Sequence, residues 1–111
     1  MHLTASAERD FREILQWTVL QFGVTQARRY AETLAGAMVE LGGGPAVLGV
    51  KARDDIAPGL FTLHVARNGR RGRHFVMFRL DHTEGKRVVE VLRLLHDAMD
   101  LPRHRPPPDD R

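Results

Sequence analysis

Apolar residues in the first forty positions recur at helical spacing and form two separate stripes. The first stripe consists of Ala7, Phe11, Ile14, Leu15, Thr18 and Phe22. The second stripe consists of Ala27, Tyr30, Ala31, Leu34, Met38 and Leu41. Because only about two residues separate the stripes, the chain must reverse direction between them. The pattern therefore predicts an antiparallel helical hairpin, with Thr4 and Thr25 as N-caps and Gly23 ending the first helix.

The second half of the chain predicts strands. After "GGGP" at 42–45 ends the second helix, three apolar segments follow, "LFTLHVA" (60–66), "HFVMFRL" (74–80) and "RVVEVLRLLH" (87–96). They are joined by turn-forming segments at 66–73, which contains Asn68-Gly69, and at 81–86. Three strands with short connections make an antiparallel meander. The prediction is an α+β fold of two layers, an N-terminal α-helical hairpin packed on a small antiparallel β-sheet.

The last of these strands is apolar on both sides. Val89, Val91 and Leu95 alternate with a second set, Val88, Leu92 and Leu94. One side should meet the helices, and the other should meet a partner segment or be covered by a loop or the tail of the chain. The sequence leaves these two alternatives open.

Composition limits the class of protein. The 111 residues fit a single domain over 1–100, followed by a tail over 101–111 that holds four of the six prolines. The chain has no cysteine, no apolar run that could span a bilayer and no apolar export signal, so we expect a cytoplasmic protein. The six histidines lack metal-site spacing. We expect no metal and no cofactor.

Positive charge is concentrated in the second half. Residues 1–55 hold six Lys/Arg against seven Asp/Glu (−1), and residues 56–111 hold eleven against seven (+4), which together give the net charge of +3. The densest cationic segment is 67–79, with no acidic residue; it contains Arg67, Arg70, Arg71, Arg73, His74 and Arg79. This segment could bind phosphates or an acidic protein. The alternative is a solubilising turn.

A nuclease would need a base for a ribose hydroxyl, an acid for the leaving oxygen and cations around the phosphate. His74 and His96, with Arg73, Arg79 and Arg93, could supply these groups. Spacing alone does not show that they converge. The sequence contains no serine or cysteine nucleophile motif and no glycine-rich phosphate loop.

Four segments in order resemble one family. "AERDFREILQWTVLQFGVTQARRYAETL" resembles the helical hairpin of RelE/ParE toxins, and "RDDIAPGLFTL", "GRHFVMFRL" and "VLRLLHDAMDLPRH" resemble its later strands and its tail. The resemblance covers residues 3–105 and implies a short N-terminal strand besides the elements above. ParE-type toxins inhibit DNA gyrase and block replication, and RelE-type toxins cleave mRNA on the ribosome. Both are neutralised by an antitoxin, which for ParE is often a ribbon-helix-helix protein.

The resemblance favours the ParE branch. RelE-type toxins commonly carry a tyrosine near the end of the chain, whereas the single tyrosine here is Tyr30 on the second helix. The chain instead closes with "LLHDAMD" at 94–100, as in ParE. The resemblance thus implies a gyrase inhibitor that is not an enzyme and that serves plasmid stabilisation and growth inhibition. The alternatives are a ribosome-dependent endoribonuclease using His74, His96, Arg73 and Arg79, and an antitoxin-binding module without toxicity.

The same resemblance suggests contact residues. For the target we expect Arg73, His74, Arg79, Arg93 and Arg103. For the antitoxin, in a toxin–antitoxin hetero-oligomer, we expect Phe22, Tyr30, Leu34 and Met38. We expect no membrane association and no sequence-specific binding of nucleic acid.

Overall fold

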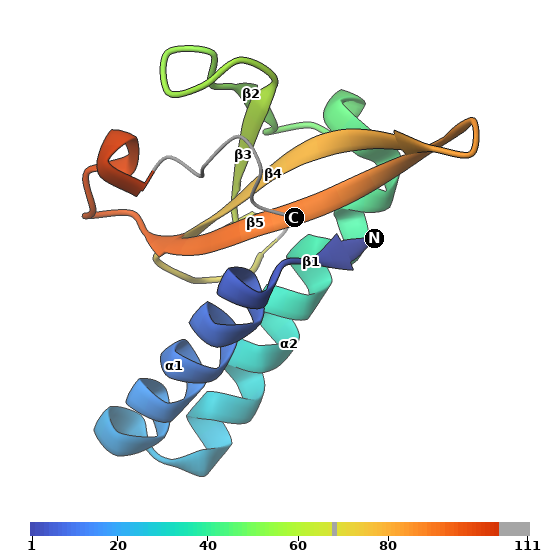
Figure 1. Ribbon diagram of the computed structural model, residues 1–111. Helices are drawn as coiled ribbons and strands as arrows, with labels where there is room; N and C mark the ends of the chain where they lie inside the picture. Colours follow the sequence, from blue (N-terminus) through green and yellow to red (C-terminus); the bar gives the residue numbers. More distant parts are fainter. Residues whose placement is uncertain (68, 105–111) are drawn as a thin grey trace.

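The computed structural model, which describes residues 1–67 and 69–104, has an α-helical hairpin packed on one face of a five-stranded sheet (Figure 1). The joined end of the hairpin projects beyond the sheet. The predicted fold class is confirmed. In chain order the elements are β1 (His2–Leu3), α1 (Ala5–Phe22), α2 (Val24–Glu40), η1 (Leu41–Ala46), β2 (Lys51–Ala52), β3 (Leu60–His64), β4 (His74–Thr83), β5 (Lys86–His96) and η2 (Leu101–His104).

Both ends of α1 lie where the sequence predicted them, and the predicted start of α2 does not hold. Thr4 caps α1, because its Oγ1 accepts the backbone N–H of Ala7 at 3.1 Å. Gly23 ends α1 with a φ of 92°, a backbone conformation that favours glycine. The prediction that Thr25 caps α2 is wrong, since α2 begins at Val24 and has no side-chain cap. The connection is so short that Gly23 serves both helices.

The sheet has the strand order β1-β5-β4-β3-β2. The predicted antiparallel pairing of β3, β4 and β5 is confirmed. Two short strands extend it: β2 pairs antiparallel with β3, and β1 pairs parallel with β5 through His2↔Glu90 and Leu3↔Val91. The sheet is therefore mixed, and the short N-terminal strand that the family resemblance implies is present.

The connection between β4 and β5 is tighter than predicted. The sequence suggested a turn over 81–86, but pairing continues to Thr83↔Lys86, which leaves only Glu84 and Gly85 as the loop. Their φ values of 53° and 74° are both positive, as a two-residue type I′ hairpin requires. The other predicted turn includes Asn68, which lies outside the described residues.

Two apolar clusters lie on the two faces of the sheet. The larger lies under the helical hairpin and includes Leu34, Leu41 and Phe78, each fully buried. The second consists of Ile56, Leu60, Met77, Leu92, Leu95 and Leu101. The far side of β5 is thus covered by the chain's own loop and by η2. Leu101, which the sequence assigned to the tail, is only 6% exposed, so the packed core reaches past the predicted boundary at residue 100.

A break in register alters the predicted alternation along β5. Opposite Met77 and Phe78 the pairing shifts by one residue, as at a β-bulge. As a result Leu94 joins Val89 and Val91 under the helices, while Leu95 faces the second cluster. The prediction that Leu95 shares a face of the strand with Val89, and Leu94 with Leu92, is therefore wrong beyond the bulge.

Asp10 of α1 holds this irregular stretch. Its carboxylate accepts hydrogen bonds from Arg93 Nε at 2.7 Å, from Arg93 Nη2 at 3.0 Å and from the backbone N–H of Leu94 at 2.9 Å. Asp10 is only 8% exposed. A buried carboxylate needs such partners, because burying a charge without them is costly. The ion pair thereby fixes α1 against β5.

Candidate functional site

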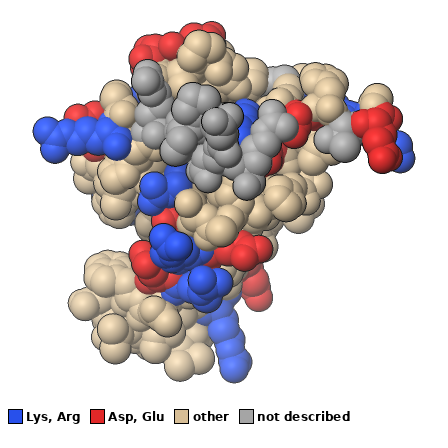
Figure 2. Space-filling view, in the orientation of Figure 1, with Lys and Arg blue, Asp and Glu red and all other residues tan. Residues whose placement is uncertain are grey.

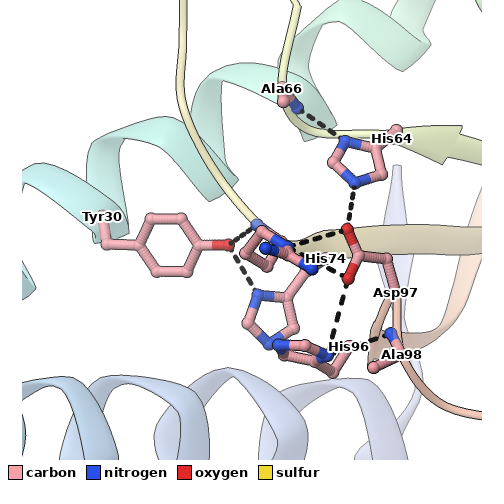
Figure 3. Close-up of polar contacts among 8 residues, drawn as sticks. Tyr30, His64, Ala66, His74, His96, Asp97 and Ala98 are labelled. Atoms are coloured by element: carbon pink, nitrogen blue, oxygen red, sulfur yellow. Dashed lines mark hydrogen bonds and ion pairs between the residues drawn. The ribbon is translucent and has the colours of Figure 1, made fainter.

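Tyr30 connects the helical hairpin to the start of β4 (Figure 3). Its hydroxyl accepts the backbone N–H of Arg73 at 3.2 Å and lies 2.5 Å from Nδ1 of His74. The Tyr30 hydroxyl and His74 Nδ1 share one hydrogen bond, and the tautomer of His74 determines which of the two is the donor. Tyr30 packs against the core, as its place in the apolar stripe predicts, and its side chain is only partly buried because its hydroxyl makes this polar contact.

Asp97 joins three basic side chains at the same end of the sheet (Figure 3). Its carboxylate lies 3.0 Å from His64 Nε2, 3.1 Å from Arg73 Nε and 3.6 Å from His96 Nδ1. The Asp97 backbone N–H also donates to the carbonyl of Arg73 at 2.7 Å. Because His74 pairs with His96 in the register of β4 and β5, both rings are brought beside this carboxylate.

The electrostatics of the cluster keep His74 neutral. Burial, followed by the neighbouring His96, lowers the pKa of His74 from 6.5 to about 4. Burial also raises the pKa of Tyr30, so its proton stays on the oxygen. The hydrogen bond from His64, reinforced by the hydrogen bond from Arg73, lowers the pKa of Asp97. At neutral pH the cluster therefore combines a neutral imidazole, a phenol, a carboxylate and a guanidinium.

A cavity of about 310 Å³ opens between this cluster and the end of the hairpin. Trp17 and Phe22 line its helical side, with rings packed edge-on and centroids 5.8 Å apart. Tyr30, His74 and His96 line the other side. Trp17 is 57% exposed and Phe22 is 65% exposed. Large aromatic side chains this exposed beside polar groups mark a surface suited to binding.

The joined end of the hairpin forms an apolar surface, which we call the hairpin tip; its exposed side chains are Trp17, Val19, Leu20, Phe22 and Val24. In Figure 2 most of this end of the molecule is tan, with Lys, Arg, Asp and Glu side chains above it and one Lys or Arg side chain extending beside it. Leu20 is 82% exposed. A contiguous surface of this kind is uncommon outside interaction sites.

The arginines of segment 67–79 are not a uniform basic surface. Glu40 at the end of α2 forms ion pairs with Arg67 and Arg70. Arg79 pairs with Glu90, which is 5% exposed. Arg71 is exposed, and the Arg73 side chain is 72% exposed. Much of the predicted cationic surface thus serves the fold, and the solvent-facing charge is concentrated at Arg71 and Arg73.

The structure brings together some of the predicted site residues. Arg73, His74 and His96 of the nuclease alternative converge, whereas Arg79 lies five residues further along β4 in its own ion pair. Arg93 is held by Asp10. Arg103 lies in η2 with its side chain 83% exposed, near Asp100.

The predicted antitoxin contacts differ from one another in how exposed they are. Phe22 is exposed, Tyr30 is half-buried, and Leu34 is fully buried, so Leu34 presents no surface in this conformation. Met38 is 6% exposed and lines a second cavity of about 330 Å³ between α1 and α2, with Leu3, Phe11 and Ala35.

Sequence reasoning missed Asp97, His64 and Trp17. Asp97 carries a weak signal, because an acidic residue directly after a strand that ends in histidine sits beside that histidine. His64 and Trp17 show no signal, since only the tertiary fold brings them to the cluster and to the cavity. Among residues 1–67 and 69–104, no group of three or more His, Asp or Glu side chains could hold a metal ion. No helix in the same ranges is long and apolar enough to cross a membrane.

Known proteins match this chain along most of its length. The family described as the ParE toxin of the type II toxin–antitoxin system parDE matches residues 1–101. The chain is 29% identical to Toxin ParE1 of Mycobacterium tuberculosis (strain CDC 1551 / Oshkosh) over 102 residues, which cover 92% of this chain and 93% of that protein. Toxin ParE1 of strain ATCC 25618 / H37Rv matches with the same 29% identity and coverage.

A solved structure shares the fold. The YoeB/ParE toxin from Agrobacterium tumefaciens superposes with a TM-score of 0.57 at 21% identity, covering 86% of this chain and 98% of that one. The match to the family over residues 1–101, together with the helical hairpin on a mixed sheet, leads to one conclusion. The chain belongs to the ParE toxin family of type II toxin–antitoxin systems.

Proposed function

We propose that this toxin inhibits DNA gyrase in the cytoplasm and that it acts by binding rather than by catalysis. Membership of the ParE family supports the proposal, and the observation that carries it is the hairpin tip beside the exposed Arg73. An apolar surface with a cationic rim is suited to a large macromolecule. In this proposal Trp17, Leu20 and Phe22 contact gyrase and Arg73 lies at the edge of the contact. Arg103 is a second, more distant contact.

The proposal is tested with purified protein in a gyrase supercoiling assay. We expect inhibition by the unaltered chain and weaker inhibition by Leu20→Asp and by Arg73→Ala, because both side chains are largely exposed. Arg87→Ala is the matched control, since it removes an exposed charge from the other end of the β4–β5 hairpin. Inhibition that is unchanged by Leu20→Asp and Arg73→Ala would remove this surface from the contact.

A second candidate function is ribosome-dependent cleavage of mRNA, and one observation favours it. His74, His96 and Arg73 lie together beside Tyr30, as acid–base chemistry at a phosphate requires. In this alternative, cells that express the toxin contain cut transcripts, and His96→Ala abolishes the cleavage. Intact transcripts together with inhibited supercoiling would exclude it.

We further propose that a ribbon-helix-helix antitoxin places an apolar segment in the groove between α1 and α2. The groove is lined by Leu3, Phe11 and Met38, with Ala35 exposed at its edge. Ala35→Glu would put a charge in the groove without changing the core. We expect this variant to remain toxic and to escape its antitoxin in a co-expression growth assay. Gln21→Glu, an exposed change elsewhere on the hairpin, is the control.

A further inference from the structure

The backbone of Arg73 is held on both sides, although its side chain is 72% exposed. Its N–H donates to the Tyr30 hydroxyl of α2 at 3.2 Å, and its carbonyl accepts the backbone N–H of Asp97 at 2.7 Å. One contact comes from the helical layer and the other from the turn after β5. The Arg73 side chain therefore starts from a fixed point beside the cavity that Trp17 and Phe22 also line.

Asp97 also holds the guanidinium of Arg73. Arg73 Nε donates to both carboxylate oxygens of Asp97, at 3.2 Å to Oδ1 and at 3.1 Å to Oδ2. A guanidinium has further N–H donors on its two Nη atoms. Within residues 1–67 and 69–104 the structure shows no hydrogen bond from either Nη atom of Arg73. These donors therefore remain for a partner, while Asp97 determines how the guanidinium is oriented.

The Asp97 carboxylate is itself oriented by a residue of β3 (Figure 3). The backbone N–H of Ala66 donates to His64 Nδ1 at 3.0 Å, so neutral His64 carries its proton on Nε2. His64 Nε2 lies 3.0 Å from Asp97 Oδ2 and donates to it. The Asp97 side chain is only 21% exposed. The contacts thus run outward from His64 to Asp97 and end at the exposed guanidinium of Arg73.

We infer that Asp97 is a positioning residue for the contact with gyrase: it holds the Arg73 guanidinium ready to bind a carboxylate on the gyrase surface. The inference rests on the proposed function and adds a residue that does not itself touch the target. A guanidinium binds a carboxylate through two parallel N–H donors, and a side chain that is already fixed loses less conformational freedom on binding.

Charge and positioning predict opposite effects when Asp97 is removed. A negative charge beside Arg73 opposes attraction to an anionic group, so by charge alone the loss of Asp97 should strengthen binding. If Asp97 positions Arg73, its loss leaves the guanidinium mobile and weakens binding. The sign of the change therefore separates the two roles.

The test is a double-mutant cycle of Asp97→Ala and Arg73→Ala in the full-length protein. The affinity for DNA-free gyrase is measured by isothermal titration calorimetry. Asp97→Ala alone should weaken binding by about 3- to 12-fold, as expected when one long side chain must be immobilised on binding. In the Arg73→Ala chain the same change should alter affinity by less than about 1.5-fold, because no guanidinium is left to position.

Two further variants complete the design. Asp97→Asn should have an intermediate effect, because its amide oxygen still accepts from Arg73 Nε without the charge, and it takes the place of Asp97→Ala if that variant does not fold by circular dichroism. Asp55→Ala is the matched control: it removes a carboxylate that accepts Arg53 Nε at 3.1 Å in the loop between β2 and β3, and it should leave affinity unchanged.

Weaker binding that disappears in the Arg73→Ala background supports the inference. Stronger binding by Asp97→Ala would overturn it, as would equal losses in both backgrounds, which a purely structural role of Asp97 predicts. Coupling seen only in supercoiling assays with DNA would place the anionic group on DNA and overturn its assignment to gyrase. These outcomes leave gyrase inhibition standing, whereas an unaltered chain that neither binds nor inhibits gyrase would remove the proposed function as well.

Discussion

Gly72 is required by its neighbours rather than by its own backbone angles. A Cβ placed there would lie 2.5 Å from Val65 Cγ2 and 2.9 Å from both Cε1 and the hydroxyl oxygen of Tyr30. The glycine therefore lets the segment before β4 approach α2 closely enough for Tyr30 to reach Arg73 and His74. No pattern in the sequence distinguishes this glycine from one that only provides a flexible turn.

Gly72→Ala should destabilise the protein by about 1–3 kcal/mol, because overpacking forces either Tyr30 or Val65 to move. Urea denaturation gives the free energy of unfolding. Gly42→Ala is the matched control, since a Cβ at Gly42 would meet nothing within 4 Å. Equal stability of the two variants would show that the contact with Tyr30 relaxes at little cost.

His74 should make stability depend on pH. The pKa of His74 is lowered to about 4 in the folded chain from its ordinary 6.5, so between these values the unfolded chain binds more protons. The free energy of unfolding should therefore fall as pH decreases through this window, by about 1–2 kcal/mol after allowance for partial exposure. Asp97, whose pKa is lowered from 3.8, contributes a decrease of the same sign that begins at about pH 5 and lies mostly at lower pH. In His74→Gln the free energy of unfolding, measured from pH 7 to pH 4, should fall by less than in the unaltered chain. An equal fall in both would contradict a lowered pKa of His74.

At the scale of the elements, residue patterns predicted the long helices and strands but not the short ones, and only the family resemblance implied β1. Eighteen residues of α1 and seventeen of α2 repeat the helical period often enough to be read from sequence. Strands β1 and β2 have two residues each and show no periodicity. The bulge in β5 was equally invisible, because the sequence gives no sign that Asp10, more than eighty residues away in the chain, accepts the Leu94 N–H beside it.

Asp10→Ala should destabilise the fold by about 3–5 kcal/mol, since it leaves Arg93 without its carboxylate and the Leu94 N–H without its acceptor. The comparison is Asp100→Ala, which breaks the exposed pair with Arg103 and should cost less than about 1 kcal/mol. Thermal denaturation of both variants measures the difference. A small effect at Asp10 would mean that water replaces the carboxylate and that the bulge is not held by α1.

Leu34→Ala should cost about 2–5 kcal/mol, because Leu34 is fully buried between the hairpin and the sheet. Leu20→Ala on the hairpin tip should change stability by less than about 0.5 kcal/mol, because Leu20 is 82% exposed. Denaturant titration of the pair tests which face of each helix is internal. A large loss of stability in Leu20→Ala would show that Leu20 is buried in solution, in a contact that the structure of the single chain does not contain.

On the scale of the whole molecule, the candidate site joins both halves of the chain. Tyr30 comes from α2, His64 from β3, His74 from β4, and His96 and Asp97 from the end of β5. Sequence reasoning identified His74, His96 and Arg73 as chemically able residues but could not show that they meet. These residues are brought together by the register of β4 with β5 and by the projection of the hairpin. Both are properties of the tertiary structure.

The parallel pairing of β1 with β5 has a consequence for the order in which the protein is made. Leu3 pairs with Val91, and the N–H and hydroxyl of Thr4 donate to the carbonyls of Val91 and Leu92, so these residues depend on a strand that is made much later. A nascent chain can form its helices early, but it cannot close its sheet until residues 86–96 have left the ribosome. The surfaces that depend on a closed sheet, including the one formed by His74, His96 and Asp97, therefore appear only after this strand has been made.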